Sequence, residues 1–386
     1  MRSRVAVAVV TVAAVLTACA PLPASTPRAP ATATTRSAPA PTPAPTPSLT
    51  PTPMPVDPIA RLSLAQRVGQ LFMVGTPTAS AASGTRAAVS DRHVGGIFLH
   101  SGGRTSVSRT ASLVAGFTAL VSPASTGDVP LWVATDQEGG DVQVLSGPGF
   151  DPIPSALAQG KMAAPGLQTV ATGWGEQLMQ AGVNVDLAPV ADIVTSPSVA
   201  RQNKPIGLLN RQYGYDEQTV ADKAGAFADG MRQAGVLPTF KHFPGLGRTG
   251  SNTDFAPAVD TVVDAASPDV DVYRSLLSGG PALVMVSTAV YERIDAARPA
   301  AFSSRVVSGL LREQVGFEGV VITDDLSAAA SVRPWAPAQR ATMAIEAGCD
   351  ILLLSSGAAL LPAMYDAVLA KAGSDPAFAA KVDAAA

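Results

Sequence analysis

Cysteine is nearly absent from this sequence, with only Cys19 and Cys349 among 386 residues. Cys19 belongs to an N-terminal segment with export signals, which leaves Cys349 without a partner. No disulfide can therefore hold the fold, and its stability must come from a large hydrophobic core. We expect Cys349 to be a small buried hydrophobic residue.

Histidine is also rare: His93, His100 and His242 are the only three, and their spacing matches no metal-ligand pattern. The net charge is −3, and no run of Lys and Arg suggests a nucleic-acid surface. The sequence contains no Walker loop and no nucleophile-elbow motif of a serine hydrolase. We therefore expect no metal, no cofactor and no nucleic-acid partner.

The first residues have the pattern of a signal peptide. Arg2 and Arg4 form a short positive region, and the apolar run 5–16 is too short to cross a bilayer as a stable helix. The next residues, Leu16-Thr17-Ala18-Cys19, resemble a bacterial lipobox, in which the Cys is lipidated after cleavage. The alternative is an ordinary signal peptide with an accidental Cys. We predict a signal peptide over residues 1–18 and lipidation of Cys19.

The following segment, residues 19–56, consists of the lipidated Cys19 and then mostly Ala, Pro, Thr and Ser. Such a composition buries too little apolar surface to offset the entropy of ordering, which predicts a disordered tether. We expect the remaining domain, residues 57–386, to be exported and held by the lipid at the outer face of the cell membrane. We expect it to be a monomer.

Eight short apolar runs alternate with helix-like stretches along this domain, and several are continuous, as in parallel strands buried on both faces. The segment 216–234 has the spacing of an amphipathic helix, with Gly235 placed to stop it. This rhythm predicts a (β/α)₈ barrel of the TIM type rather than an open doubly wound sheet, since no Gly-x-Gly-x-x-Gly turn follows the first run. The runs are 70–75, 95–100, 131–136, 183–192, 236–242, 281–289, 319–324 and 350–355.

Polar residues collect where four of these runs end. The ends are 136–140 (DQEGG), 189–192 (PVAD), 241–245 (KHFPG) and 323–326 (TDDL). In a (β/α)₈ barrel, the active site lies at the carboxyl ends of the strands. The pattern therefore predicts a site on this rim.

Asp324 closes a very apolar run, which places a carboxylate at the barrel mouth, where it can act as a nucleophile or charge stabiliser. The alternative is a helix N-cap for residues 326–330, a role that Asp325 fits at least as well. We assign the chemistry to Asp324, and the cap or a supporting hydrogen bond to Asp325.

Three more residues at the strand ends are candidates for binding a ligand, and two of them have an alternative structural interpretation. Lys241 and His242 are adjacent on a strand, so they should face opposite sides unless the strand bends at Pro244. They can donate to sugar hydroxyls, or Lys241 can be a buried partner of a barrel carboxylate. Asp136 can accept from a ligand or bond to the turn at 139–140.

The segments 136–140, 241–245 and 322–327 resemble the three signature strand ends of glycoside hydrolase family 3. The similarity is greatest to the single-domain bacterial β-N-acetylhexosaminidases. Residues 62–75 also look like that family's opening helix and first strand, and the match runs in order over 60–370.

This resemblance implies a hydrolase for terminal β-linked N-acetylhexosamine, such as N-acetylglucosamine from peptidoglycan fragments or chitooligosaccharides. It implies a retaining mechanism with Asp324 as the nucleophile. It also implies that Asp136, Lys241 and His242 hold the sugar at the −1 site, and that Arg211 contacts the same sugar.

The sequence departs from the family after the Lys-His-Phe-Pro-Gly motif, where relatives carry Asp-Ser-His and the His belongs to the acid/base dyad. Here the residues are Asn252-Thr253-Asp254, and no other His is available nearby. Asp254 can replace the His in proton transfer. Arg248 of the same loop would work against this role, because a nearby cation favours the ionised carboxylate. We then expect weak activity with a more acidic optimum than that of relatives that carry the His. Alternatively the acid/base is lost, and the domain is a lipid-anchored sugar-binding protein or hydrolyses only activated substrates.

Two further departures concern the sugar contacts and the end of the chain. Val144 stands where the family has an Arg that contacts the sugar, which could change substrate preference. The chain also ends before the family's last amphipathic stretch is complete, which predicts a short final helix.

Overall fold

The computed structural model describes residues 59–100 and 103–386. The signal peptide predicted for 1–18, the lipidation of Cys19 and the tether over 19–56 lie outside the described residues. Within the described ranges, no helix has the length and apolarity needed to cross a membrane.

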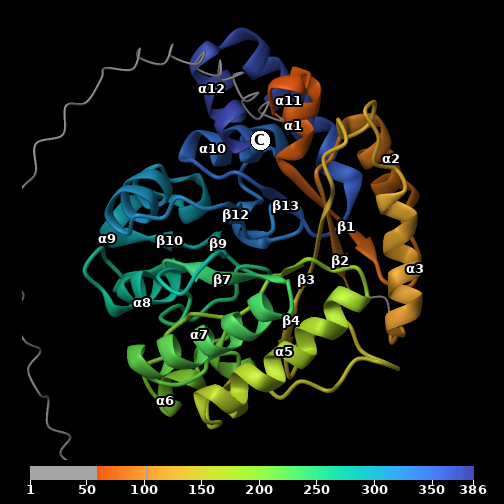
Figure 1. Ribbon diagram of the computed structural model, residues 1–386. Helices are drawn as coiled ribbons and strands as arrows, with labels where there is room; N and C mark the ends of the chain where they lie inside the picture. The colour runs from red at the N-terminus through yellow and green to blue at the C-terminus, as the bar shows by residue number, and fades with distance from the viewer. Residues whose placement is uncertain (1–58, 101–102) are drawn as a thin grey trace, which may run out of the picture. The chain divides into compact units, whose positions relative to one another are not determined.

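Eight parallel strands form one sheet, and each overlaps one of the eight predicted runs. The two end strands of the sheet meet through a single bridge between Ile322 and Ile351, which closes it into a TIM-type barrel (Figure 1). The predicted fold class is thus confirmed. In order around the sheet, the strands are β12 (Val321–Thr323), β9 (Leu283–Val286), β7 (Leu237–Phe243), β6 (Val185–Asp186), β3 (Trp132–Thr135), β2 (Gly96–His100), β1 (Phe72–Pro77) and β13 (Leu352–Leu354).

Helices surround the strands, and those that follow successive strands cover neighbouring parts of the sheet (Figure 1). The longer ones are α1 (Leu64–Gln70), α2 (Ser83–Arg92), α3 (Val107–Thr118), α5 (Ala164–Gln180), α7 (Glu217–Gln233), α8 (Pro268–Leu277), the π-helical η4 (Arg305–Gln314), α10 (Pro337–Ala347), α11 (Leu361–Ser374) and α12 (Pro376–Ala385). The final helix, α12, has only ten residues.

Short elements fill the loops. The helical ones are η1 (Ile59–Arg61), α4 (Ala156–Gln159), α6 (Pro197–Ala200), η2 (Gly207–Leu209), α9 (Glu292–Asp295), η3 (Ala300–Phe302), η5 (Ala330–Val332) and η6 (Ala358–Leu360). The short strands are β4 (Gln137–Gly139) and β5 (Val142–Gln143), which form a hairpin, and β8 (Val259–Asp260), β10 (Val290–Tyr291) and β11 (Ala296–Pro299), which form a three-stranded sheet.

The predicted helix over 216–234 is α7, and its ends have local causes. The Asp216 side chain accepts a hydrogen bond from the Thr219 N–H at 2.8 Å, as an N-cap does. Gly235 follows the C-cap with φ of 87°, a left-handed conformation that glycine adopts without steric cost. The prediction for this segment is confirmed.

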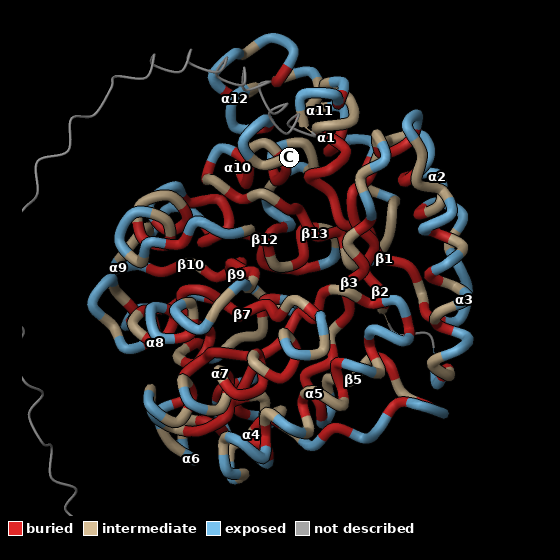
Figure 2. Tube along the Cα trace, viewed as in Figure 1, coloured by how far each residue is buried: buried red, intermediate tan, exposed pale blue. Residues whose placement is uncertain are grey.

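The core has two parts because strand residues alternate between the two faces of the sheet. On β1, Phe72 and Val74 pack under the helices, whereas Met73 points into the barrel with residues such as Leu187, Met285 and others from the remaining strands. The strands are buried along most of their length, and exposed residues lie mainly on the helices and loops (Figure 2). The barrel interior is thus filled by side chains below the rim.

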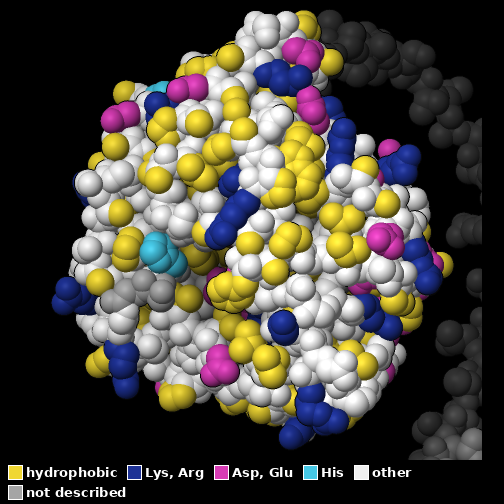
Figure 3. Space-filling view, turned by 180° about the vertical axis from the view of Figure 1, so that it is seen from behind, with side chains coloured by type: hydrophobic (Ala, Val, Ile, Leu, Met, Phe, Trp, Pro, Cys, Tyr) yellow, Lys and Arg dark blue, Asp and Glu magenta, His cyan; other side chains and the backbone are white. Residues whose placement is uncertain are grey.

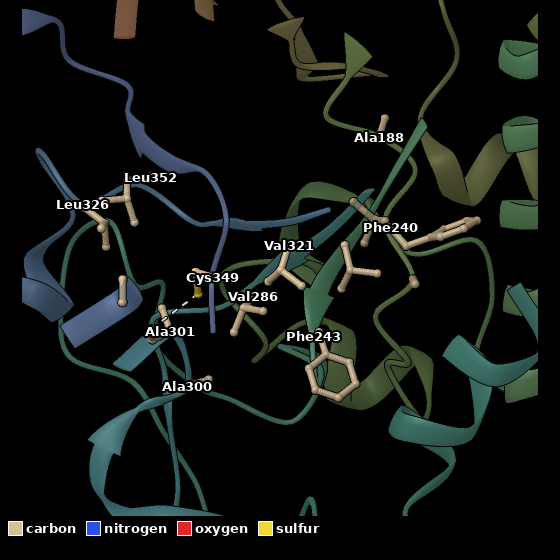
Figure 4. Close-up of a cluster of buried hydrophobic side chains, with 14 of the residues drawn as sticks. Ala188, Phe240, Phe243, Val286, Ala300, Ala301, Val321, Leu326, Cys349 and Leu352 are labelled. Carbon is tan, nitrogen blue, oxygen red and sulfur yellow. Dashed lines mark hydrogen bonds between the residues drawn. The ribbon is translucent and has the colours of Figure 1, made fainter. Parts of the chain in front are cut away.

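Cys349 is 1% exposed and packs in this core, near Val286 and Val321 (Figure 4). Its Sγ lies 3.6 Å from the Ala301 carbonyl oxygen. Burial raises the pKa of the Cys349 thiol, so the group stays neutral. The prediction of a small buried hydrophobic residue is confirmed.

Candidate active site

A pocket of about 860 Å³ opens at the carboxyl ends of the barrel strands. In the space-filling view, one face of the molecule is hollowed near its centre, and hydrophobic side chains border the hollow beside Lys and Arg side chains (Figure 3). All six predicted catalytic and substrate-binding residues line the pocket. They are Asp136, Arg211, Lys241, His242, Asp254 and Asp324.

One wall of the pocket is a network of buried charges centred on Glu138. Arg211 donates to both of its carboxylate oxygens, at 2.8 and 2.7 Å, and the Lys241 Nζ lies 2.6 Å from Oε1. The same Nζ donates to the Asp136 Oδ1 at 2.6 Å. Burial alone would raise the pKa of Glu138, but Arg211 and Lys241 together lower it to about 2. Two cations and two carboxylates thus hold one another in place.

The contacts of Lys241 bear on its two predicted roles, binding a sugar and pairing with a barrel carboxylate. Burial lowers the pKa of its ammonium group, but Asp136 and Glu138 outweigh that effect and raise it. Lys241 is therefore the buried partner of barrel carboxylates, and it also lines the pocket. Glu138 was not predicted as a site residue, although it lies inside the strand-end motif 136–140.

Lys241 and His242 both line the pocket, so the opposite orientation expected for an unbent strand does not hold, and the exception allowed for a distorted strand end applies. The physical reason is a β-bulge: the register of β7 against β9 shifts between Lys241 and Phe243. The peptide between Lys241 and His242 is cis.

His242 is held by a buried carboxylate that was not predicted as a site residue, Asp192. The His242 Nδ1 lies 2.8 Å from Asp192 Oδ2, and because a carboxylate accepts, Nδ1 carries the proton. Asp192 Oδ1 accepts from the backbone N–H groups of His242 and Leu246, at 3.2 and 2.7 Å. The imidazole orientation is thus fixed, and Nε2 is left as its second polar atom. The strand end 189–192 was the signal that could have identified Asp192.

Asp325 fixes the loop after β12, as the supporting role predicted for it requires. Its carboxylate accepts from the backbone N–H groups of Ser327, Ala328, Ala329 and Ser355, at 2.6 to 3.1 Å. The helix considered for residues 326–330 does not form, because the carboxylate satisfies these donors in a loop; helical turns begin only at η5. Asp324 is left facing the pocket, with one oxygen accepting from the Asp325 N–H at 2.8 Å.

Asp254 is brought to the same pocket by a loop that is tied to the one after β12. The Ala330 N–H donates to the Asp254 carbonyl, and the Ser331 N–H donates to the Thr253 carbonyl, both at 3.1 Å. Asp254 is partly exposed, but its carboxyl group loses much of its contact with solvent. This desolvation and the neighbouring Asp324 carboxylate raise the pKa of Asp254 to about 6. Burial also raises the pKa of Asp324, against the charge of His242.

The expectation that Arg248 favours ionised Asp254 is wrong. Arg248 is paired instead with Asp269, with Nη2 and Oδ2 2.8 Å apart. The guanidinium group that lowers the pKa of Asp254 is that of Arg211, a residue 43 positions away in the chain. Arg248 and Asp254 belong to the same loop, but the Arg248 side chain forms its ion pair with the buried Asp269 carboxylate.

The expectation that no other His is available near Asp254 is also wrong. His242 lines the same pocket as Asp254 and Asp324, and its charge lowers the pKa of both carboxyl groups. His100, at the end of β2, lines the same pocket. Among the described residues, no group of three or more His, Cys, Asp or Glu has the arrangement of a metal site.

We expect Glu138→Gln to lower the free energy of unfolding by roughly 3 kcal/mol at pH 7, because it removes one partner of a buried ion-pair network. The pKa of Glu138 is about 2 in the folded protein, against 4.5 for a free side chain, so its contribution is complete above pH 4.5 and is lost as the pH falls through 2. Urea unfolding at pH 7 and pH 3 measures the difference, which should be smaller at pH 3.

The control is Glu346→Gln, which breaks a pair between Glu346 and Lys371 on the surface. Since exposed ion pairs contribute little, we expect a change below about 1 kcal/mol. Equal effects of the two substitutions would contradict the central role of Glu138.

Comparison with known proteins gives one family for nearly the whole domain. The model of the glycosyl hydrolase family 3 N-terminal domain matches residues 63–385. The β-hexosaminidase LpqI of Mycobacterium tuberculosis is 34% identical over 305 residues, which cover 76% of this chain and 74% of the relative. An uncharacterised secreted glycosyl hydrolase of Arthroderma benhamiae is 33% identical over 77% of this chain and 84% of its own.

Among solved structures, the fold is similar to that of a β-N-acetylhexosaminidase from Beutenbergia cavernae. The TM-score is 0.83 and the sequence identity is 53%, over 84% of this chain and 96% of that protein.

Proposed function

The chain belongs to glycosyl hydrolase family 3 and is a glycosidase, and on that basis we propose that it removes terminal β-linked N-acetylhexosamine. The sugar we propose is N-acetylglucosamine, from peptidoglycan fragments or chitooligosaccharides. The observation that carries the proposal is that Asp324 and Asp254 line one pocket, where burial and the Asp324 carboxylate raise the pKa of Asp254 and burial raises that of Asp324.

The proposed reaction has two steps and retains the anomeric configuration. In the first, the ionised Asp324 carboxylate attacks the anomeric carbon, and protonated Asp254 gives its proton to the departing glycosidic oxygen. In the second, Asp254, now a carboxylate, takes a proton from water while the water oxygen displaces Asp324 from the sugar. A pKa of about 6 allows Asp254 to serve in both forms near neutral pH.

The remaining predicted residues would hold the sugar at the −1 site. Asp136 is 26% exposed at its side chain, and only its Oδ1 accepts from Lys241, which leaves Oδ2 for a sugar hydroxyl. The Nε2 of His242 is oriented by Asp192 and is available to the same ligand. Arg211 donates two hydrogen bonds to Glu138 and one to the Pro205 carbonyl oxygen. Its remaining N–H groups can donate to the substrate.

The test is turnover of an aryl N-acetyl-β-glucosaminide beside the matching aryl β-glucoside, from pH 4 to pH 8. We expect hydrolysis of the first substrate only. For a disaccharide of the same sugar, whose leaving group needs a proton, the rate should fall as the pH rises through about 6, because Asp254 then loses the proton it must donate. Binding of N-acetylglucosamine without turnover at any pH would instead indicate a sugar-binding protein.

We also propose that the protein acts outside the cytoplasm, anchored through a lipid on Cys19. The sequence pattern 16–19 supports this, and one relative is described as secreted. Cys19→Ala should move the protein from the membrane fraction to the soluble exported fraction, because a substituted residue cannot be lipidated. Fractionation followed by immunoblotting measures the shift, and a variant that still sediments with membranes would refute the anchor. Cys349→Ala is the control and should stay with the parent protein.

A further inference from the structure

Two adjacent loops form one side of the pocket mouth. One contains Thr253, Asp254 and Phe255, and the other, after β12, contains residues 328–333. Two backbone hydrogen bonds of 3.1 Å join them, as described above for Asp254. Phe255 and Arg333, one from each loop, both line the pocket. Neither residue has a part in the proposed reaction at the −1 sugar.

Phe255 is 82% exposed, the highest value among the large exposed hydrophobic side chains of the described chain. An aromatic ring left in water at a pocket mouth is a candidate contact for a ligand. Phe255 also follows Asp254 directly in sequence, so its backbone is fixed by the same loop. The flat apolar face of a pyranose ring suits such a side chain.

Arg333 is an exposed cation at the same mouth. Lys241 and Arg211, the other Lys and Arg side chains of the pocket, are both tied to Glu138. Arg333 makes one long hydrogen bond, 3.4 Å to the Ala328 carbonyl, and no ion pair with a described carboxylate. Its positive charge is therefore not neutralised by a contact in the part of the chain that the structure describes.

A second guanidinium group strengthens this positive region. Arg340 is buried and donates to the carbonyl oxygens of Leu326 and Trp335. Burial lowers the pKa of Arg340, Asp325 opposes this, and the charge of Arg333 lowers it further, so the two guanidinium groups are neighbours. The Asp325 carboxylate is occupied by backbone donors. Asp325 thus acts on Arg340, whereas Arg333 makes no ion pair with a described carboxylate and is the guanidinium group that a ligand anion in the pocket can meet.

The position of the acid/base decides which part of the substrate reaches this place. A general acid must lie beside the glycosidic oxygen, so the leaving group has to pass next to Asp254. Phe255 follows Asp254 in sequence, Arg333 belongs to the loop bonded to Asp254, and both side chains line the same pocket. We propose that Phe255 and Arg333 form a leaving-group subsite that favours a sugar bearing a carboxylate, its ring against Phe255 and its carboxylate on Arg333. This inference rests on the proposed function and extends it to the second sugar.

The test compares two disaccharides that differ only in one carboxylate: N-acetylglucosamine β-linked to glucuronate, and the same sugar linked to glucose. Their Kd values are measured on the full chain carrying Asp324→Asn, so that no turnover is needed. We expect a Kd about five- to tenfold lower for the glucuronate at low salt, a ratio that shrinks as salt screens the pair.

Substitutions assign the effect to the two residues. Arg333→Met should bring the ratio near one by weakening the glucuronate far more than the glucoside, and Arg333→Lys should keep part of the ratio. Phe255→Ala should weaken both ligands by a similar factor. Arg109→Met, on an exposed position of α3 outside the pocket lining, is the control and should keep the full ratio.

Equal Kd values for the two disaccharides, or a ratio that survives Arg333→Met, would overturn the subsite. These outcomes are distinct from failure of the proposed function. That failure would appear as absence of turnover of every N-acetylglucosaminide by the parent protein, whatever the binding ratio.

Discussion

Asp324→Asn is expected to lower the turnover of an aryl N-acetyl-β-glucosaminide on the order of 10⁴-fold or more, because an amide cannot form the glycosyl ester. The fold should persist, since the side chain makes a single local hydrogen bond, to the Asp325 N–H, and otherwise faces the pocket. Circular dichroism and urea unfolding check the fold, and steady-state kinetics measure the loss.

A 2-fluoro sugar with a good leaving group should label the parent protein at Asp324, because the fluorine slows the second step more than the first. Peptide mass spectrometry locates the label, and the Asp324→Asn variant should remain unlabelled. A label on Asp325 would reassign the nucleophile. The structure argues against that assignment, because four backbone N–H groups already occupy the Asp325 carboxylate.

Asp254→Ala is expected to slow substrates with poor leaving groups by roughly 10²- to 10⁴-fold, and aryl glycosides with good leaving groups far less. Only a poor leaving group needs a proton as it departs. The decrease in rate as the pH rises through about 6 should also disappear in the variant, because that limb reports loss of the Asp254 proton. The measurements are kcat/KM for a disaccharide and for an activated aryl glycoside across the pH range.

Asn252→Ala is the control for the loop, since it removes the neutral side chain that accepts from the Asp254 N–H at 2.9 Å. Asn252→Ala should change kcat/KM for both substrates by a similar factor and should keep the decrease in rate as the pH rises through about 6. An equal loss on both substrates in Asp254→Ala would remove Asp254 from the acid role. A limb that persists in that variant would point to His242, whose charge acts on both carboxylates.

The barrel could be predicted from the sequence because its signals are local. Each buried parallel strand is a short run such as 319–324, and its neighbours in the chain need not be known to recognise it. Asp216 and Gly235 likewise set the ends of α7 through bonds and backbone angles within a few residues. The strand ends then followed from the barrel rule, which is why 136–140 and 241–245 fell on the rim.

What the sequence by itself determined was therefore the set of strands, the rim that carries polar residues, and the family. The tertiary structure alone decided which of those residues meet. Glu138 pairs with Arg211 and Lys241 from separate segments of the chain, and Arg248 pairs with Asp269 instead of stabilising ionised Asp254. Such contacts depend on distances between side chains that are far apart in the chain, and no local pattern records them.

The orientation of side chains at the end of β7 is a second feature that only the tertiary structure decided. Alternation along an ideal strand would send Lys241 and His242 to opposite faces, but the bulge against β9 turns both to the pocket. A bulge arises from pairing with another strand, so its position depends on the partner's register. For that reason the residue types of this site could be predicted from the sequence, whereas their arrangement around Asp324 required the packed barrel.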